Sequence, residues 1–133
     1  MPHSKLLSVG LLVVMMFFSL GMADIPEIEI EVAPNVLNIQ SSGNIVTVHT
    51  NVPYGDVEAG GVELNGIDIN SWKADNRGYF VAKFLIDELK TPESLKIDDY
   101  NTLALTGVLK DGTGFMGLSE IMVIDVVPEK KGN

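Results

Sequence analysis

Short runs in which apolar and polar residues alternate, each ended by a turn, constrain this chain more than any other feature. Over residues 27–32, three glutamates alternate with Ile28, Ile30 and Val32. The alternation returns over Ile45–Val52, and turn sequences then recur about every 8–12 residues. Because successive side chains of a strand point to opposite faces, a period of two predicts strands with one buried face. The pattern therefore predicts an all-β protein.

Further runs predict strands over residues 36–39, 62–64, 67–72, 79–85, 102–110 and 115–126. Asn65-Gly66 is the strongest hairpin signal, because both positions of its tight turn need a positive φ. Ile86–Lys90 predicts one short helical turn, which Pro92 prevents from continuing. Seven or eight short strands in about 105 residues is the size of an immunoglobulin-like antiparallel β-sandwich. We expect that sandwich over residues 24–127.

The N-terminus has the three parts of a secretory signal over residues 1–23. Lys5 gives a basic start, Leu6–Leu20 is apolar and uncharged, and Gly21–Ala23 places small residues at the cleavage positions. An uncleaved membrane anchor is the alternative, but a span needs about 20 apolar residues and this run is shorter. We expect export to the extracellular space or a periplasm, with cleavage before Asp24.

Charge and composition exclude several classes of function. The chain has 18 acidic and nine basic residues, and loss of residues 1–23 removes Lys5 and no acid. Eight bases against 18 acids then give a net charge of −10 over 110 residues. A nucleic-acid binder needs a basic surface, so we expect no nucleic-acid partner. After cleavage of residues 1–23 we also expect no integral membrane span. Without cysteine there is no disulfide or thiolate chemistry. Residues 128–133 are polar and are expected to be a disordered tail.

Four short motifs follow one another along the predicted sandwich: Glu31–Gly43, Val62–Gly66, Val81–Phe84 and Leu105–Phe115. In this order, with the pattern L-N-x-x-S-x-G, V-x-L-N-G and L-x-G-x-L-x-D-G-T-x-F, they resemble a secreted immunoglobulin-like module of bacterial and archaeal surface and exported proteins. The resemblance spans about residues 29–126. It implies a non-catalytic β-sandwich, often found beside dockerin, cohesin-like or other immunoglobulin-like repeats.

The loop before the third motif departs from that family. Many relatives carry an acidic, calcium-type loop there, whereas this sequence has Ala74–Gly78. Calcium takes six to eight oxygen ligands, while Asp75 and Asn76 supply two side chains and Arg77 adds a positive charge. The sequence favours a plain turn in which Gly78 has a positive φ. Calcium binding through Asp75 and Asn76 is the alternative.

The inventory of catalytic side chains is small. His49 is the only histidine left after signal cleavage, and it lies on the polar face of its predicted strand. A general base also needs a positioned nucleophile and an orienting partner. Asp98 and Asp99 would point to opposite faces of a strand, so they do not form a catalytic pair. We expect no enzyme and no catalytic, cofactor-binding or metal residue; a small hydrolase that uses His49 is a competing hypothesis.

The only tryptophan, Trp72, has two interpretations. It could form an exposed aromatic platform for carbohydrate with Tyr54, Tyr79 or Tyr100. The interpretation we favour is that Trp72 packs in the core, as a single tryptophan often does in such sandwiches.

The last predicted strand is apolar on both faces, since Ile121 and Val123 alternate with Met122 and Ile124. If one face is uncovered, Met122, Ile124 and Val126 form a patch for a partner chain. The sequence therefore predicts a non-catalytic secreted or cell-surface module that acts in protein interaction or as a structural or adhesive subunit. A small-ligand module for carbohydrate or calcium is the alternative.

Overall fold

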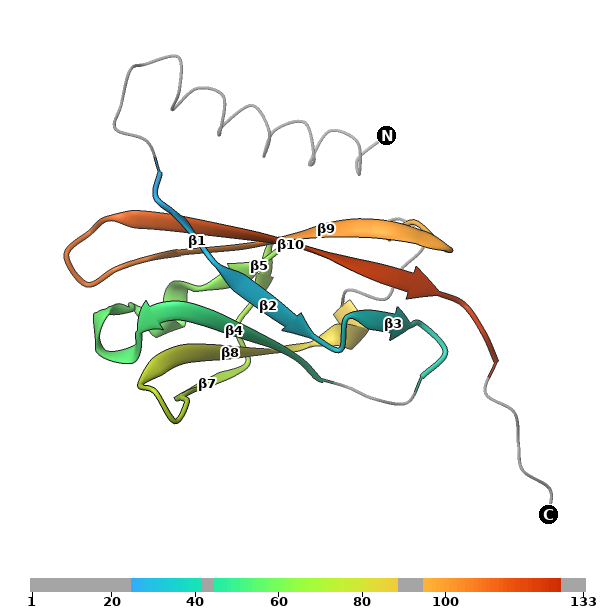
Figure 1. Cartoon of the computed structure of the whole chain (residues 1–133), viewed down its shortest axis with the longest axis horizontal. Coiled ribbons are helices and arrows are strands. Elements are labelled where there is room, and N and C mark those ends of the chain that lie inside the picture. The colour runs from blue at the N-terminus through green and yellow to red at the C-terminus, as the bar shows by residue number, and fades with distance from the viewer. Residues whose placement is uncertain (1–24, 42–44, 89–94, 128–133) are drawn as a thin grey trace.

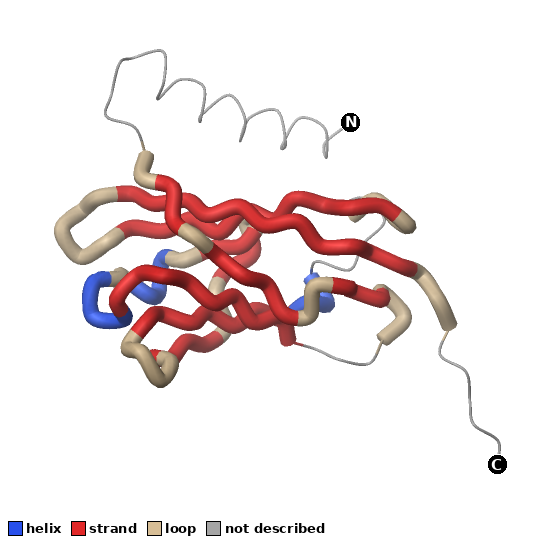
Figure 2. The backbone as a smooth tube through the Cα atoms, viewed as in Figure 1, coloured by secondary structure: helices blue, strands red, loops and turns tan. Residues whose placement is uncertain are grey.

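The computed structural model describes residues 25–41, 45–88 and 95–127, which form two packed β-sheets (Figures 1 and 2). Those residues contain ten strands: β1 (Glu27–Ile28), β2 (Ile30–Ala33), β3 (Val36–Asn38), β4 (Ile45–Pro53), β5 (Glu63–Leu64), β6 (Ile67–Asp68), β7 (Ser71–Ala74), β8 (Tyr79–Leu85), β9 (Asp99–Val108) and β10 (Gly114–Ile124). Three 3₁₀ turns also lie within them: η1 (Tyr54–Asp56), η2 (Ala59–Gly61) and η3 (Ile86–Glu88). The predicted signal, residues 1–23, and the predicted tail, residues 128–133, lie outside the described residues.

The strand order of the two sheets is that of an immunoglobulin sandwich. One sheet has the order β2-β4-β8-β7, and the other has β1-β10-β9-β5-β6 with β3 also paired to β10. If β4 is taken as strand B of the immunoglobulin naming, the order β2-β4-β8-β7 corresponds to A-B-E-D. The order β10-β9-β5 then corresponds to G-F-C. The predicted all-β, immunoglobulin-like sandwich is confirmed. The number of strands differs from the expected seven or eight, because two predicted strands are each divided between the sheets.

The first division lies in the N-terminal segment. Ile28 of β1 pairs in parallel with Gly117 of β10, whereas β2 pairs antiparallel with β4 in the other sheet. After the cis Ala33-Pro34 peptide the chain returns to β10 through β3. The prediction of one strand over residues 27–32 is therefore wrong at Glu29. Ile28 in one sheet and Ile30 and Val32 in the other all face the same core. The alternation of apolar and polar residues therefore continues unbroken where the chain changes sheet.

Gly117 makes this crossing possible. A Cβ atom added there would lie 2.5 Å from Cγ2 of Ile30 and 3.1 Å from Cγ1 of Ile28. The two isoleucines flank the point where the segment changes sheets, so they pack directly on the backbone of β10. Only a residue without a side chain leaves that space.

The second division separates β6 from β7. Asn65 and Gly66 have φ values of 48° and 84°, so the predicted tight turn is confirmed and β6 pairs back on β5. Ile69 then donates its N–H to the Val62 carbonyl, and Asn70 donates to the Lys83 carbonyl of the other sheet. The prediction of a single strand over residues 67–72 is wrong, because residues 69 and 70 carry the chain across.

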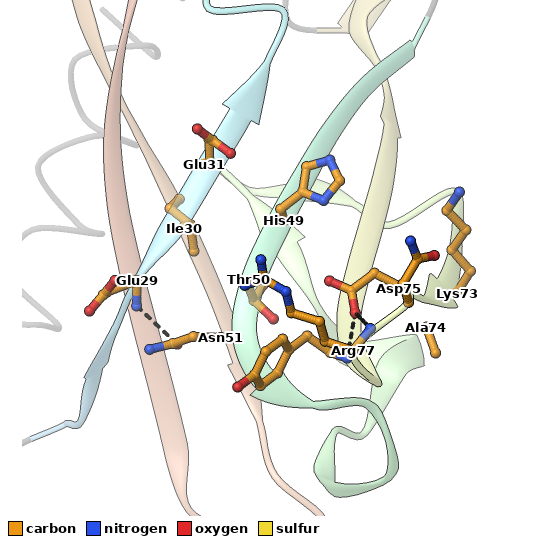
Figure 3. Close-up of a pocket in the computed structure, with 12 residues that line it drawn as sticks. Glu29, Ile30, Glu31, His49, Thr50, Asn51, Lys73, Ala74, Asp75 and Arg77 are labelled. Atoms are coloured by element: carbon orange, nitrogen blue, oxygen red, sulfur yellow. Dashed lines mark hydrogen bonds between the residues drawn. The ribbon is translucent and has the colours of Figure 1, made fainter.

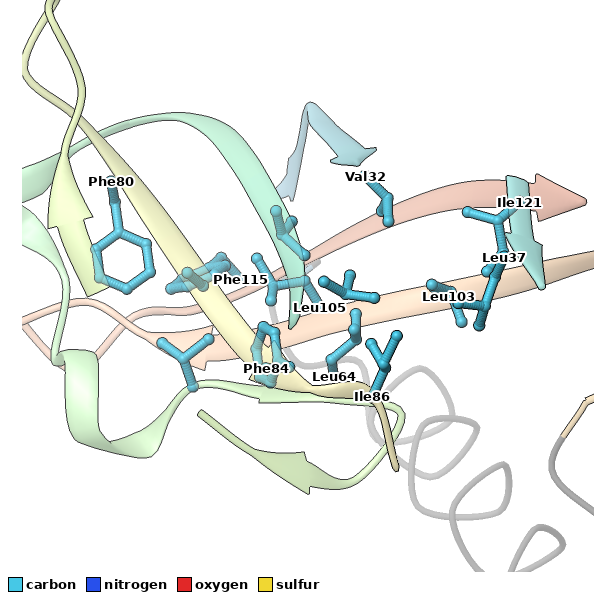
Figure 4. Packing of buried hydrophobic residues seen from close by; sticks show 14 of the residues in the cluster. Val32, Leu37, Leu64, Phe80, Phe84, Ile86, Leu103, Leu105, Phe115 and Ile121 are labelled. Atoms are coloured by element: carbon cyan, nitrogen blue, oxygen red, sulfur yellow. The ribbon is translucent and has the colours of Figure 1, made fainter. Parts of the chain in front are cut away.

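The core lies between the sheets and is apolar (Figure 4). Its largest fully buried side chains come from five strands: Leu37, Leu64, Phe80, Phe84, Leu103, Leu105 and Ile121. Val46, Val48 and Val52 of β4 are buried as their alternation predicts. The buried hydroxyl of Thr50 donates to the Phe80 carbonyl at 2.7 Å. Within the described residues, every buried side-chain nitrogen and oxygen has a hydrogen-bond partner.

Trp72 is not in this core, which corrects the favoured interpretation. Its side chain is 43% exposed. The residue pairs with buried Ala82, so it faces inward, but β7 is the edge strand of its sheet. Phe80 and Phe84 of the neighbouring strand fill the centre instead. The tryptophan therefore projects at the margin of the sandwich.

We predict that Gly117→Ala destabilises the fold by about 1–3 kcal/mol, because the added methyl group collides with Ile30 and forces a shift of the crossing segment. Gly114→Ala in the same strand is the matched control, since its added Cβ would have its nearest neighbour at 3.9 Å. That control should change stability by less than about 0.5 kcal/mol. Urea unfolding of both variants checks the prediction, and equal stabilities would contradict the proposed close approach.

Candidate functional site

The outer face of the four-stranded sheet carries an open groove of about 820 Å³ (Figure 3). Strands β2 and β4 and the β7–β8 hairpin supply its walls. Glu31 is paired with His49, and both His49 and Lys73 are paired with Val81. Val81 is fully buried although it stands outside the core cluster, because its polar neighbours cover it on this face.

Charges of both signs line this groove. Glu29, Glu31 and Asp75 bring carboxylates, and Lys73 and Arg77 bring cationic groups. The N–H of Glu29 donates to Oδ1 of Asn51 at 3.1 Å, which fastens the crossing segment to β4. Figure 3 shows the His49 ring projecting between Glu31 and Asp75. The groove is therefore a polar surface with nearly balanced charge.

Asp75 has a structural task in the hairpin. Its Oδ1 accepts the N–H of Tyr79 at 2.9 Å and the N–H of Arg77 at 2.8 Å. The Tyr79 N–H is the main reason why the pKa of Asp75 lies below its ordinary value, and the N–H and charge of Arg77 and the charge of His49 lower it further. Gly78 has a φ of 86°, so the predicted turn is confirmed.

The same loop is the one for which the sequence offers calcium binding as an alternative. Asp75 is half-buried and Asn76 is exposed, and both line the groove. Across residues 25–41, 45–88 and 95–127, no three His, Asp or Glu side chains are grouped so that they could hold a metal ion. Asp75 uses one carboxylate oxygen for the turn, as a solvated Asx-turn residue does.

Trp72 lines a second, smaller depression of about 240 Å³. Tyr54, Gly60 and Lys110 also line it, and the Tyr54 ring stacks on Phe80 with centroids 6.2 Å apart. Of the three tyrosines considered as partners of Trp72, the structure brings only Tyr54 to this place. Tyr79 lines the groove on the other face of the sheet, and Tyr100 belongs to the opposite sheet.

The outer face of the six-stranded sheet is different in character. In the register of β9, β10 and β3, Tyr100 pairs with Met122 and Met122 pairs with Val36. Tyr100 is 59% exposed and Val36 is 48% exposed. Four residues along the hairpin and on the same face, beyond the Glu120–Thr102 pair, Leu118 lies opposite Ala104 and is 45% exposed. We call the surface formed by six side chains the apolar face: Val36, Tyr100, Ala104, Leu118, Met122 and Ile124.

Two of the three residues predicted for an interaction strand belong to the apolar face. Met122 and Ile124 are half-buried there, and Val126 is exposed beyond the end of β10. Sequence reasoning missed Val36 and Tyr100, because a neighbour across strands is known only once the register is known. The β9–β10 turn was the available signal, since its position fixes which residues of the two strands face each other.

Comparison with family models, curated proteins and solved structures gives no match for this chain. Within the described residues, no helix is long and apolar enough to cross a bilayer. Function is therefore inferred from the chemistry of the two outer faces and of the Trp72 depression.

We predict that Asp75→Ala lowers the melting temperature, whereas Asp75→Asn lowers it less, because the amide oxygen keeps the acceptor for Arg77 and Tyr79. Since the folded-state pKa of Asp75 is depressed, its contribution to stability is present above the ordinary pKa and is lost as the pH falls through the folded one.

The measurement is the melting temperature of the wild type and Asp75→Asn between about pH 2 and pH 7. The difference between the two should be constant near neutrality and shrink below about pH 4. A difference that does not depend on pH would show that the carboxylate charge has no part in holding the turn.

Proposed function

We propose that this chain is a non-catalytic, exported β-sandwich module that binds another protein chain through the apolar face. The observation that carries the proposal is the row of Tyr100, Met122 and Val36, which crosses three strands of one sheet. Large exposed apolar side chains placed side by side are typical of interaction sites, whereas single ones are common on any surface.

Chemistry on this face supports a protein partner. Tyr and Met are enriched at the centres of protein interfaces, and charged residues are depleted there. Among the strands that form the apolar face, β3, β9 and β10 direct only Glu120 away from the core, and Glu27, Glu63 and Asp68 lie on the same side at the margins of the sheet. The face is formed by hydrogen-bonded strands, so its shape is set before a partner arrives and little ordering entropy is lost on binding.

The groove around His49 supports catalysis less well than the apolar face supports protein binding. Thr50, the hydroxyl residue next to it in sequence, points to the other side of β4 and donates to the Phe80 carbonyl. Asp75, the carboxylate whose charge reaches His49, is held by two backbone N–H groups. Such bonds are typical of a side chain that stabilises a hairpin, and we assign no catalytic residue here.

A small-ligand module is the second candidate, and the exposure of Trp72 favours it. Trp72 and Tyr54 line one depression with Lys110 beside them, and aromatic side chains can stack on sugar rings. Titration with soluble polysaccharides and with calcium, followed by tryptophan emission, tests this candidate. An unchanged emission spectrum and melting temperature would remove it.

We predict export with cleavage before Asp24, because residues 1–23 have the basic, apolar and small-residue parts of a signal. Mass spectrometry of the exported chain should give an N-terminus at Asp24. Lys5→Glu together with two charges placed in Leu6–Leu20 should keep the protein inside the cell. An exported chain that still begins at Met1 would favour the anchor instead.

A photo-reactive phenylalanine analogue at Tyr100 should cross-link the exported protein to another protein chain in its native setting, because Tyr100 stands on the apolar face. The same analogue at Tyr54, an exposed tyrosine away from that face, is the matched control. Adding Leu118→Glu should abolish the Tyr100 product by placing a charge in the contact. The proposed function fails if Tyr100 gives no product, or gives one that Leu118→Glu leaves unchanged.

A further inference from the structure

We infer that this sandwich has a mechanical function: it resists tension between its N-terminal and C-terminal sides, because its first and last strands are paired so that such tension loads them in shear. This function needs no partner on the apolar face, so it goes beyond the proposed function. The direction of strand pairing, the hydrogen bonds at both ends of that pairing and the packing at Gly117 support it.

The first strands of the sandwich pair in parallel with the last one. β1 pairs with β10 at Met116 and Gly117, and β3 pairs with β10 around Val123. We call these two pairings the terminal clamp. Because β10 has 11 residues, at about 3.3 Å per residue it extends over about 36 Å. Figure 1 shows the start of β1 and the arrowhead of β10 at opposite ends of the sandwich.

Tension between these two ends acts along β10. It pulls the N-terminal segment and β10 in opposite directions along their common axis, whereas the hydrogen bonds of the clamp join one strand to the other across that axis. All the bonds then share the load and must break together. If the strands are instead separated from one end, the bonds break one after another. Since forced unfolding is governed by the unfolding rate, the shear direction should withstand more force.

Backbone bonds fasten the N-terminal segment to β10 at two separate places. The Met116 N–H donates to the Pro26 carbonyl at 3.0 Å, just before β1. The Met122 N–H donates to the Asn35 carbonyl at 3.0 Å, just before β3. Between these two places β2 pairs with β4 of the other sheet. Tension on the N-terminal side therefore reaches both sheets through one short segment.

Side chains extend the clamp beyond the last residue of β10. Nδ2 of Asn38 donates to the Val126 carbonyl at 2.8 Å, and the Val126 N–H donates to Oδ1 of Asn38 at 3.1 Å. The Asn38 amide thus pairs with Val126 as another backbone unit of a strand would. Nε2 of Gln40 also donates to Oδ1 of Asp125 at 2.7 Å. These bonds lie where tension on the C-terminal side enters the sandwich.

Packing at Gly117 opposes sliding of the N-terminal segment along β10. Ile28 and Ile30 occupy the space that a side chain at this position would need. Tension draws both isoleucines toward the earlier part of β10, where the next residue that faces the core is the buried Phe115. Because the Phe115 ring already fills that place, the isoleucines must leave their packing on the core before the strands can slide.

Single-molecule force spectroscopy of the exported protein in two pulling directions tests the inference. Handles at the N- and C-terminal ends load the clamp in shear. Handles at the N-terminal end and at Lys110→Cys peel β1 from β10 instead, because Lys110 lies in the turn before β10. The natural chain has no cysteine, so this attachment is unique.

We expect the unfolding force in the shear direction to be at least about twofold higher than in the peeling direction at the same loading rate. Equal forces, or a lower force in the shear direction, would overturn the inference. Neither outcome depends on whether Tyr100 cross-links to a partner, so the mechanical function and the proposed function can fail separately.

Asn38→Ala separates the clamp from general stability. It removes both bonds to Val126, so the force in the shear direction should fall, whereas the force for peeling at the other end of the clamp should change little. Asn76→Ala, in the β7–β8 turn away from the clamp, is the matched control and should leave both forces unchanged. If Asn38→Ala lowered both forces equally, the side chain would contribute only to stability and the clamp would be contradicted.

Discussion

Burial of one apolar side of each sheet against the other is the interaction on which everything else in this molecule depends. The chain has no cysteine, so no disulfide shares the task. The polypeptide passes from one sheet to the other several times, and two of these passages, at Glu29 and at residues 69 and 70, fall inside runs that the sequence pattern predicts as single strands. Gly117 allows the first passage, and the backbone bonds of Ile69 and Asn70 hold the second. Each passage connects a strand of one sheet directly to a strand of the other.

The sequence indicated strands and turns well, because both depend on neighbours in the chain. Val46 and Val48 are buried, Asn65 and Gly66 form their tight turn, and β8 has the predicted bounds. Sheet membership was not predictable, since Ile28 and Ile30 face a common core whichever sheet they join. The exposure of Trp72 was missed for a related reason. Its position depends on β7 being an edge strand, which is a property of the topology and not of the local pattern.

The candidate site was predicted in part. Met122 and Ile124 were found because a strand that is apolar on both faces must either be covered twice or leave one side open. Val36 and Tyr100 complete that surface through hydrogen-bond register, which is invisible in local composition. The consequence is a molecule with two unlike outer sides: the groove mixes acidic and basic side chains, whereas the other side groups Val36, Tyr100 and Met122. Because the two sides differ in chemistry, a partner that binds the apolar face is expected to leave the groove side exposed.

The shortness of the outermost strands has one more consequence. β6 has two residues and β7 has four, so neither offers a long row of free backbone groups to an incoming strand. Strand addition is how many β-proteins grow into fibres, and the short edge strands β1, β2, β6 and β7 offer little template for it. A contact through the side of a sheet is different, because it leaves the edge strands unextended. The contact proposed for the apolar face therefore does not itself build a fibre.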